Sequence, residues 1–338
     1  MRRKIGAREL AEIADVSVAT VSRVLNDKPG VSDDTRKKIL RIMREYGYRP
    51  QVISNRSEGF GLIILGGLNV FQRGFFSELL EGLTFTAFRY KRNLTLIEGT
   101  TNDLTPDNLS HKMRSNGLSG FVVIGSLLTP GQCLRLAEFE SPLVVVGGSE
   151  RVEGCNWVGV DHFESAYNLI KYLTSIGHKR IGFVMPSSEE PVPQERFKAL
   201  MQVLKELDLK TSADWTYGLS KEETLRYMGS PPSKRPTVLV GLNDESTIFS
   251  VQVLQDIGLR VPEDVSVVGF SGSKSILKFT HPAITTITID GFDMGRRAVE
   301  LLFDLEEEPV SKPIVDVVET NLIIRDSTSP IGISEVAQ

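Results

Sequence analysis

The spacing of apolar and polar residues changes near residue 60. Before that point the apolar residues recur at helical spacing and predict three short helices, over 8–14, over 17–26 and from Ser32 to a stop at Gly47. After it, short apolar runs alternate with longer amphipathic stretches. The change predicts a small helical N-terminal unit followed by a long α/β body.

The body alternates predicted strands with predicted helices. Strands are expected over 60–65, 94–98, 120–124, 143–146, 180–185, 237–240 and 265–270. Helices are expected between them, over 75–90, 106–115, 130–139, 162–176, 194–206 and 244–257. This order predicts parallel sheets with helices on both faces. The body is too long for one such sheet, which favours two lobes of the flavodoxin or periplasmic-binding-protein type.

The first two predicted helices are separated only by Asp15 and Val16, which leaves room for nothing longer than a tight turn. Ser17 is a good N-cap for the second helix. The apolar stripe of that helix is Val21, Val24 and Leu25, and its other face carries Ala19, Thr20, Ser22, Arg23 and Asn26. Two short helices joined in this way are typical of a helix-turn-helix, whose second helix fits the major groove of DNA. By spacing alone, an ordinary amphipathic helix of a bundle is an equally good interpretation.

Charge is distributed unevenly along the chain. The 338 residues carry 39 Lys and Arg against 43 Asp and Glu, a net charge of −4. Residues 1–57 hold 13 of the basic and 7 of the acidic residues, which gives a net charge of +6 there and −10 on the remainder. A basic N-terminal unit on an acidic body fits one nucleic-acid-binding module, with the body kept away from the phosphates.

Composition disfavours several classes of protein. No apolar run approaches the roughly 18 residues of a membrane helix, and charged residues follow the basic residues 2–4, where a signal peptide would need an apolar core. We therefore expect a cytoplasmic protein without membrane association, acting at the bacterial nucleoid. Cys133 and Cys155 are too few for a disulfide framework or a zinc site, and the four histidines have no metal-ligand spacing. No metal and no cofactor is expected.

An enzyme is the first alternative to a DNA-binding protein. The chain lacks the glycine spacing of dinucleotide- and phosphate-binding loops and the nucleophile elbow of hydrolases. We therefore expect that the protein is not an enzyme. The second alternative is a solute-binding or sensor protein without operator specificity, and the basic N-terminal unit argues against it.

Residues 17–26, 31–36 and 46–50 closely resemble the headpiece of the LacI/GalR family of bacterial transcription regulators. The resemblance implies a DNA-binding headpiece over 1–50 that reads one half of a pseudopalindromic operator in double-stranded DNA. It implies that Val18 and Ala19 face base edges and that Arg23 is the main polar reader. The phosphate contacts are then expected from Thr20, Ser22, Asn26, Ser32, Thr35 and Tyr48, with Ser17 at the start of the reading helix.

Residues 51–59 correspond to the hinge segment of that family, which orders on operator DNA and inserts a leucine into the minor groove. This chain has no leucine at the matching position, which falls at Ser57 or Glu58, and its linker is shorter. Val52 and Ile53 are the candidate wedges. The alternative is that this segment is a tether that does not insert into the minor groove.

The body resembles the effector domain of the same family along most of its length, most clearly at 177–181, 258–270 and 282–287. The resemblance implies two lobes that the chain crosses three times. One lobe is expected over 60–160 and 291–318, and the other over 161–290 and 319–330. The predicted fold is therefore a small all-α helix-turn-helix headpiece joined to an α/β two-lobed periplasmic-binding-protein-like effector domain.

Several predicted strands end in glycine, which lets a ligand approach the backbone closely, although tight turns explain each glycine singly about as well. The effector positions of the family fall here on Phe75, Phe76, Ser126, Arg196, Asn243 and Ser271. Core packing is an equal alternative for the two phenylalanines. For Arg196 the alternative is a surface arginine.

Two positions depart from the family. Gly147 and Gly148 stand where it often has an acidic residue, and Ser271 stands where aspartate is usual. Those carboxylates commonly bind sugar hydroxyls or a purine. The alternatives to a simple sugar are therefore an anionic or less polar ligand, or a pocket that no longer binds an effector.

Together these features predict a cytoplasmic transcription regulator, a repressor, whose operator affinity is controlled by a small-molecule effector. The effector is expected to be a carbohydrate or a related polar metabolite bound between the lobes. The last residues, 331–338, are too short and unpatterned for a tetramerising coiled coil, so a homodimer is expected.

Overall fold

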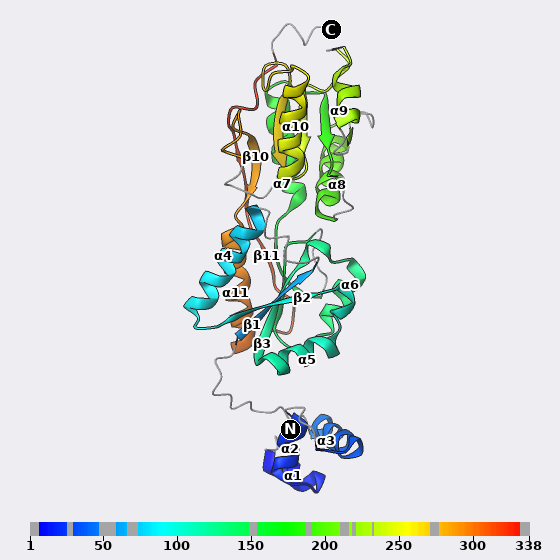
Figure 1. Ribbon diagram of the computed structural model, residues 1–338, viewed down its shortest axis with the longest axis vertical. Coiled ribbons are helices and arrows are strands. Elements are labelled where there is room, and N and C mark those ends of the chain that lie inside the picture. Colours follow the sequence, from blue (N-terminus) through cyan, green and yellow to red (C-terminus); the bar gives the residue numbers. More distant parts are fainter. Residues whose placement is uncertain are drawn as a thin grey trace. The chain divides into compact units, whose positions relative to one another are not determined.

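The structure is a computed structural model that describes residues 7–25, 30–46, 59–65, 74–148, 154–186, 191–209, 216–217, 221–231, 233–270 and 277–331. The chain divides into two compact units, Met1–Ser57 and Glu58–Gln338 (Figure 1). The first unit is the helical headpiece, and the second is the α/β body.

Within its described residues, the headpiece consists of three helices: α1 (Ala7–Ala14), α2 (Val18–Leu25) and α3 (Asp33–Tyr46). Their apolar faces pack into one small core formed by Leu10, Ala11, Ala14, Val21, Val24, Ile39 and Ile42. Asp15 turns the chain between α1 and α2 with a left-handed φ of 53°, a conformation that aspartate tolerates better than most residues. The predicted helix-turn-helix is therefore confirmed in its local geometry.

Serine residues cap α2 and α3 of the headpiece, at the predicted N-cap Ser17 and at Ser32, where the third helix was expected to start. Ser17 Oγ accepts a hydrogen bond from the backbone N–H of Thr20 at 3.0 Å, and Ser32 Oγ accepts one from that of Thr35 at 3.3 Å. Each bond satisfies a backbone donor that the first turn of a helix leaves without a partner. The starts of α2 and α3 are thus fixed by the residues that the sequence indicated.

The first lobe of the body is built on a parallel sheet. Its order in the described part of the chain is β11-β5-β4-β3-β1-β2. These strands are β1 (Gly59–Leu65), β2 (Leu94–Gly99), β3 (Leu118–Ile124), β4 (Leu143–Val146), β5 (Asn156–Gly159) and β11 (Val315–Val317).

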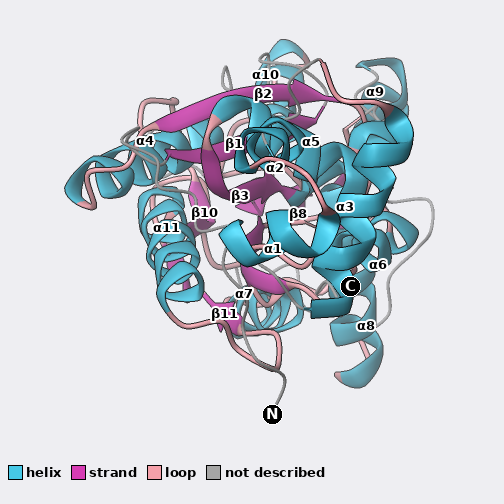
Figure 2. Ribbon diagram, turned by 90° about the horizontal axis from the view of Figure 1, so that it is seen from below, coloured by secondary structure: helices cyan, strands magenta, loops and turns pink. Residues whose placement is uncertain are grey.

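Helices cover both faces of this sheet (Figure 2). On one face lie α4 (Gly74–Arg89) and α11 (Gly291–Glu307), which pack against Leu62 and Ile64. On the other lie α5 (Pro106–Asn116) and α6 (Pro130–Ala137), which pack against Ile63 and Leu65. Alternate residues of β1 therefore face opposite layers, as a strand buried on both sides requires.

The second lobe repeats the plan. Its sheet has the order β12-β10-β9-β8-β6-β7 among the described residues, and only the β10–β12 pair in it is antiparallel. The strands are β6 (Ile181–Val184), β7 (Thr216–Tyr217), β8 (Val238–Gly241), β9 (Ser266–Phe270), β10 (Thr285–Ile289) and β12 (Thr320–Ile323). The helices α7 (His162–Ser175) and α8 (Pro191–Glu206) cover one face, and α9 (Lys221–Met228) and α10 (Asp244–Asp256) cover the other.

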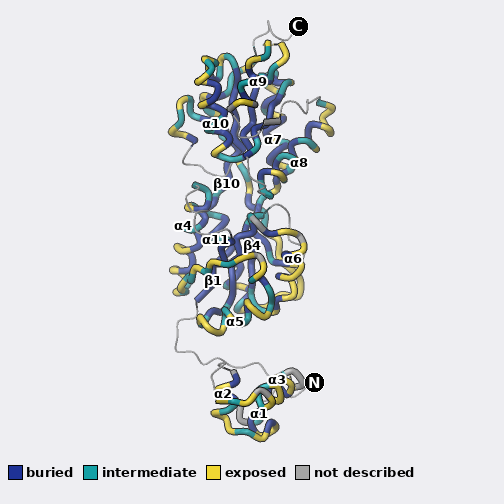
Figure 3. The backbone as a smooth tube through the Cα atoms, turned by 45° about the vertical axis from the view of Figure 1, so that its right-hand side comes forward, coloured by how far each residue is buried: buried dark blue, intermediate teal, exposed yellow. Residues whose placement is uncertain are grey.

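The chain passes between the lobes in three places. It leaves the first sheet after β5 to start α7, returns after β10 to start α11, and leaves again after β11 to form β12. Two of these passages end at helices capped by aspartate, Asp161 for α7 and Asp290 for α11. Figure 3 shows the strands of both lobes buried and the outer faces of their helices exposed.

Most predicted elements of the body lie within a few residues of the observed ones. The helix expected from 194 starts earlier, at Pro191, because proline suits the first position of a helix. The sequence patterns gave no individual prediction for α9, α11, β5, β7, β10 or β11. In the part of the chain that is described, every helix is too short or too polar to pass through a bilayer.

Candidate DNA-binding face and effector site

Helix α2 presents to solvent the residues that were predicted to face DNA. Val18 is 48% exposed, and Ala19 and Arg23 are exposed as well. On the opposite side Val21 and Val24 are buried in the headpiece core. The exposed face has small side chains near the start of the helix and one long cation, Arg23, in its last turn. These are the features that a helix needs in order to approach the major groove of DNA closely.

Two pairs of hydroxyl groups lie at the starts of α2 and α3. The Oγ of Ser17 is 2.9 Å from Oγ1 of Thr20, and the Oγ of Ser32 is 2.8 Å from Oγ1 of Thr35. Both pairs sit at helix N-termini, where the partial positive charge of the helix suits an anionic phosphate. The predicted phosphate contacts Thr20, Ser32 and Thr35 therefore share one kind of local environment with Ser17, the N-cap of α2.

Several predicted contacts fall outside the described residues. These are Asn26 and Tyr48 of the headpiece, Val52 and Ile53 of the hinge segment, and Ser271 of the body. Ser22 lies within α2, but its side chain is outside the description. Their roles stay predictions.

In the body, Arg196 of α8 is buried at the carboxyl ends of two neighbouring strands. Its Nη1 donates hydrogen bonds to the carbonyl oxygens of Leu242, at 2.8 Å, and Phe270, at 2.7 Å. Its guanidinium carbon lies 5.5 Å from the centre of the Phe270 ring. Arg196 is only 8% exposed, so it is not an ordinary surface arginine. Buried guanidinium groups at strand ends are well placed to orient a polar ligand.

Asn243 follows β8 and caps α10. Its Oδ1 accepts a hydrogen bond from the backbone N–H of Ser246 at 2.8 Å, while Ser246 Oγ accepts one from the backbone N–H of Asn243 at 3.0 Å. This reciprocal capping box fixes the start of α10. Asn243 thus has a defined structural role at the strand end where it was predicted to meet the effector.

Ser126 lies at the end of β3, in the short 3-10 helix η3 (Gly125–Leu127), and is half-buried. Helix α8, which carries Arg196, contacts η3. The structure therefore brings the elements of Ser126 and Arg196 together, although they belong to different lobes.

Phe75 and Phe76 lie in the first turn of α4, with their ring centres 5.4 Å apart in an edge-to-face arrangement. Phe76 is buried in the core of the first lobe, whereas Phe75 is half-buried against that core. Core packing accounts for the position of Phe76. Phe75 is the better placed of the two for contact with a ligand.

His162 was not predicted to be near this site. It is the first residue of α7, is 9% exposed and lies with its ring centre 6.2 Å from that of Phe270. Burial and the charge of Arg196 lower its pKa to about 3, while a hydrogen bond to the backbone of Gly148 acts in the opposite direction. The imidazole is therefore neutral near pH 7. The only signal in the sequence that could have placed His162 near this site was its position directly after Asp161, where the chain passes from the first lobe to the second.

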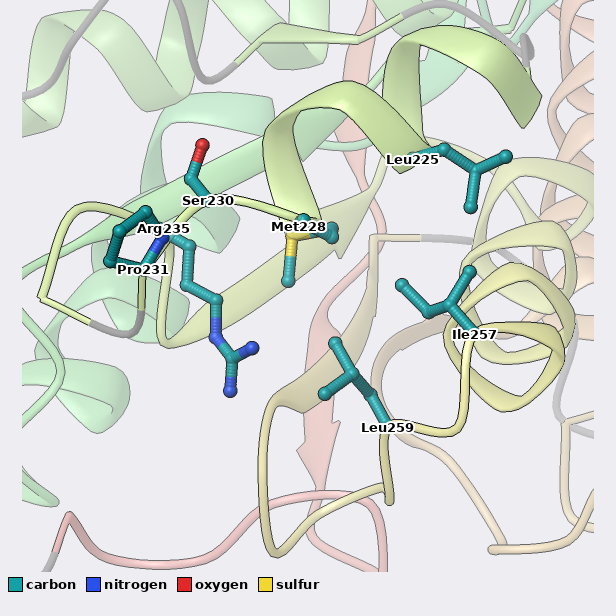
Figure 4. Close-up of a pocket in the computed structure, with 8 residues that line it drawn as sticks. Leu225, Met228, Ser230, Pro231, Arg235, Ile257 and Leu259 are labelled. Carbon is teal, nitrogen blue, oxygen red and sulfur yellow. The ribbon is translucent and has the colours of Figure 1, made fainter.

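A separate cavity of about 490 Å³ lies in the second lobe, beside α9 and the end of α10 (Figure 4). Apolar side chains converge on it from Leu225, Met228, Ile257 and Leu259, and Arg235 lies at one side. None of its lining residues is a predicted effector residue. This cavity is therefore distinct from the predicted site.

Among the described residues, no cluster of His, Cys, Asp and Glu side chains is arranged to hold a metal ion. Cys133 and Cys155 are both buried as free thiols, and burial raises the pKa of Cys155 to about 12. A thiol with so high a pKa carries almost no reactive thiolate at neutral pH.

Comparison with known families separates the N-terminal headpiece from the body, as the structure does. Residues 8–51 match the model of bacterial regulatory proteins of the lacI family, and residues 170–328 match that of the periplasmic binding protein-like domain. Catabolite control protein A of Priestia megaterium is 28% identical over 322 residues, which cover 91% of this chain and 95% of that protein.

Two solved structures have the same fold. The lac repressor dimer bound to operator and the anti-inducer ONPF has a TM-score of 0.70 at 19% identity, covering 97% of this chain and all of the other. The complex of the transcriptional regulator CelR with cellobiose has a TM-score of 0.65 at 22% identity, covering 96% of this chain and all of the other.

The headpiece and the two-lobed body together define a regulator built on the periplasmic-binding-protein plan. The two matched models lie in that order along the chain, one within each of its compact units. The chain thus carries a DNA-binding domain that matches the lacI family of bacterial regulatory proteins, followed by a periplasmic binding protein-like domain.

Proposed function

We propose that this protein is a sequence-specific DNA-binding transcription regulator, a repressor, whose affinity for operator DNA is controlled by a small-molecule effector. The observation that carries the proposal is the exposed face of α2 in a headpiece of the lacI type. We further propose that it acts in the cytoplasm, on the DNA of the bacterial nucleoid. The relatives are named as regulators, which gives no support to an enzymatic role.

In the headpiece, Val18 and Ala19 would contact base edges in the major groove, and Arg23 would donate hydrogen bonds to a base. Ser17, Thr20, Ser32 and Thr35 would hold phosphates from the starts of two helices. Ser22, Asn26 and Tyr48 are proposed to add phosphate contacts. In the hinge segment, Val52 and Ile53 are the proposed minor-groove wedges in place of the leucine of the family.

In the body, the effector would lie where the strand ends of both lobes meet. Arg196 would orient the polar groups of the effector. The site would be completed by Phe75, Ser126, Asn243 and Ser271. Phe76 would support Phe75 from the core. We propose a carbohydrate or a related polar metabolite, a class consistent with the relative solved in complex with cellobiose.

We propose that the active form is a homodimer, because an operator with two half-sites needs two headpieces. Large apolar side chains stand exposed on neighbouring elements of the first lobe. Phe85 and Phe88 of α4 are 50% and 81% exposed, and Leu96 of the edge strand β2 is 46% exposed. Apolar surface of this kind favours contact with a second copy.

The test is selection of duplexes from a random DNA pool by the full chain, followed by titration of the selected duplex at several salt concentrations. We expect a pseudopalindromic consensus and an affinity that falls steeply as salt is raised. Arg23→Ala should weaken binding by about 1–3 kcal/mol and relax specificity at one position of each half-site.

Arg135→Ala is the matched control, since Arg135 is an exposed arginine in the last turn of α6 in the body. It should bind the selected duplex like the wild type. Failure to enrich any sequence, with or without candidate sugars present, would contradict the proposed function. Equal affinity of Arg23→Ala and the wild type would contradict the assignment of the reading residue alone.

A further inference from the structure

The cavity beside α9 lies apart from the proposed effector site. Its volume of about 490 Å³ is within the range of small-molecule sites, roughly 300–1,000 Å³ (Figure 4). Ile257 and Leu259, at the end of α10, line it, whereas Asn243 of the proposed effector site caps the start of the same helix. The 13 residues of α10 separate the two places by about 20 Å. A ligand in this cavity would therefore not touch the effector.

The walls of the cavity are apolar and rest on the core of the second lobe. Met228 of α9 is 1% exposed and belongs to that core, against which Ile257 and Leu259 pack. Leu225, nearly one helical turn before Met228, lines the cavity as well and is half-buried. Because these side chains offer no hydrogen bonds, they favour a hydrocarbon group over water.

The end of α10 holds one of these walls in place. The backbone N–H of Leu259 donates to the carbonyl oxygen of Leu254 at 2.9 Å, and that of Gly258 donates to the carbonyl oxygen of Gln255 at 3.0 Å. Gly258 has a φ of +77°. Together these features form the motif that commonly ends a helix at a left-handed glycine. Leu259 is therefore positioned by the backbone, without help from a ligand.

Among the described residues that line the cavity, Arg235 is the only charged one. Its backbone is fixed, because its carbonyl oxygen accepts a hydrogen bond from Arg180 Nε at 2.9 Å and its N–H donates to the carbonyl oxygen of Pro231 at 3.3 Å. Figure 4 shows its side chain extending along one side of the cavity, past Met228. The guanidinium donates to no acceptor in the part of the chain that the structure describes.

Asp264 is near enough for the charge of Arg235 to help lower the pKa of its carboxyl, but this carboxylate is bound to another arginine. Its Oδ2 accepts hydrogen bonds from Nε and the backbone N–H of Arg260, at 2.9 and 2.8 Å. Its Oδ1 accepts one from Nη2 of the same residue at 3.2 Å. The N–H groups of the Arg235 guanidinium are therefore available to a ligand.

We propose that this cavity is a second ligand site, which binds an amphipathic carboxylate: its hydrocarbon part lies against Leu225, Met228 and Leu259, and its carboxylate accepts hydrogen bonds from Arg235. A planar guanidinium can bind both oxygens of a carboxylate at once. A sugar is excluded by cost, because its hydroxyl groups would lose water against apolar side chains. The site depends neither on DNA binding nor on the effector.

The probe is octanoate, titrated into the full chain without DNA or sugar, and the reporter is the methyl group of Met228. The seven methionines carry a ¹³C-labelled methyl group, and the variant Met228→Leu identifies the signal of Met228. Butanoate, hexanoate and octan-1-ol are titrated in the same way. Arg235→Gln removes the cation. The matched control is Arg226→Gln, since Arg226 is an exposed arginine of α9 that does not line the cavity.

We expect octanoate to shift the Met228 signal saturably, with an affinity that increases about fourfold for each methylene group from butanoate upward. The wild type should bind octanoate more tightly than octan-1-ol. Arg235→Gln should weaken the binding of octanoate by about tenfold or more and leave that of octan-1-ol unchanged, because only the carboxylate loses a charged partner. Arg226→Gln should bind both compounds like the wild type.

The absence of a shift in the Met228 signal with every acid would overturn the proposal. So would equal affinity of the wild type for octanoate and octan-1-ol, because the cavity would then have no selectivity for an anion. That comparison needs no variant, so it decides even if Arg235→Gln does not fold. An Arg235→Gln protein that binds octanoate like the wild type would also overturn the proposal. Failure to enrich an operator would count against the proposed function and leave this site standing.

Discussion

His162 and His178 are held in the body as neutral imidazoles. Burial lowers the pKa of His162 to about 3 and that of His178 to about 4. In the unfolded chain both side chains return to the usual value of about 6.5. Between the lowered values and 6.5 the unfolded state binds more protons than the folded state, so acid favours unfolding.

We predict that the free energy of unfolding decreases as the pH is lowered below about 6.5, with each of the two histidines contributing up to about 1.4 kcal/mol per pH unit. His178→Asn should make this slope shallower, because the amide does not titrate but offers a polar group near Nδ1, which lies 2.9 Å from Oγ1 of Thr237. Urea unfolding at a series of pH values measures the slope.

His111→Asn is the control for this series, since His111 is exposed. Its slope should equal that of the wild type. If His178→Asn also retains the slope of the wild type, the neutral state of His178 is not what makes the body sensitive to acid.

At the candidate site, the resemblance to the family indicated Arg196 and Asn243, and both lie at strand ends of the second lobe. It did not indicate His162, because the contacts of that residue with Gly148 and Phe270 join parts of the chain that are distant in sequence. Local patterns carry no information about such contacts. The roles of all these residues in binding stay predictions.

At the scale of elements, the helices and strands with strong local signals were predictable. Thr105 and Thr129 each precede a proline and cap α5 and α6, a combination that marks the start of a helix. The short strands β5 and β11 were not predicted individually, because three or four residues are too few for a distinct period and their pairing is with remote parts of the chain. Residues 291–318 were expected in the first lobe, but no helix was predicted for the part of them that forms α11.

The packing of α4 on α11 depends on glycine. A Cβ atom on Gly82 of α4 would overlap the carbonyl oxygen of Phe292 of α11, and one on Gly295 of α11 would overlap that of Leu79. The two helices therefore approach each other through backbone surfaces. Such a close approach leaves no room for even one methyl group.

We predict that Gly82→Ala lowers the free energy of unfolding by about 1–3 kcal/mol, because overpacking forces the two helices apart. Gly131→Ala is the matched control: it lies in α6, and a Cβ there meets no atom within 4 Å. It should be neutral or stabilising by up to about 1 kcal/mol, since alanine favours the helix. Thermal or urea unfolding of both variants measures the difference. Equal stability of the two would show that the helices can separate at no cost.

At the scale of the whole molecule, assembly follows from what the first lobe leaves exposed. Phe88 is 81% exposed on α4, and Phe85 beside it contacts Phe292 of α11, with ring centres 5.6 Å apart. When large aromatic side chains become buried in an interface, they contribute more to the free energy of binding than most other residues. The proposed homodimer would cover them.

We predict that Phe88→Glu converts the dimer to a monomer at micromolar concentration, because burying the new carboxylate without a partner opposes association. Leu134→Glu is the control, since Leu134 is 59% exposed on α6, on the opposite face of the same sheet. It should stay dimeric. Sedimentation equilibrium gives both dissociation constants. If Phe88→Glu is as dimeric as the wild type, the second copy binds elsewhere.

The passages between the lobes have a consequence for synthesis on the ribosome. The first sheet lacks an edge strand until Val315–Val317 has been made, and the second lacks one until Thr320–Ile323 has been made. By contrast, the buried core residues described in the headpiece all lie between Leu10 and Ile42. A nascent chain can therefore complete its DNA-reading unit well before the receptor that is proposed to govern it, which is finished only once Thr320–Ile323 has been made.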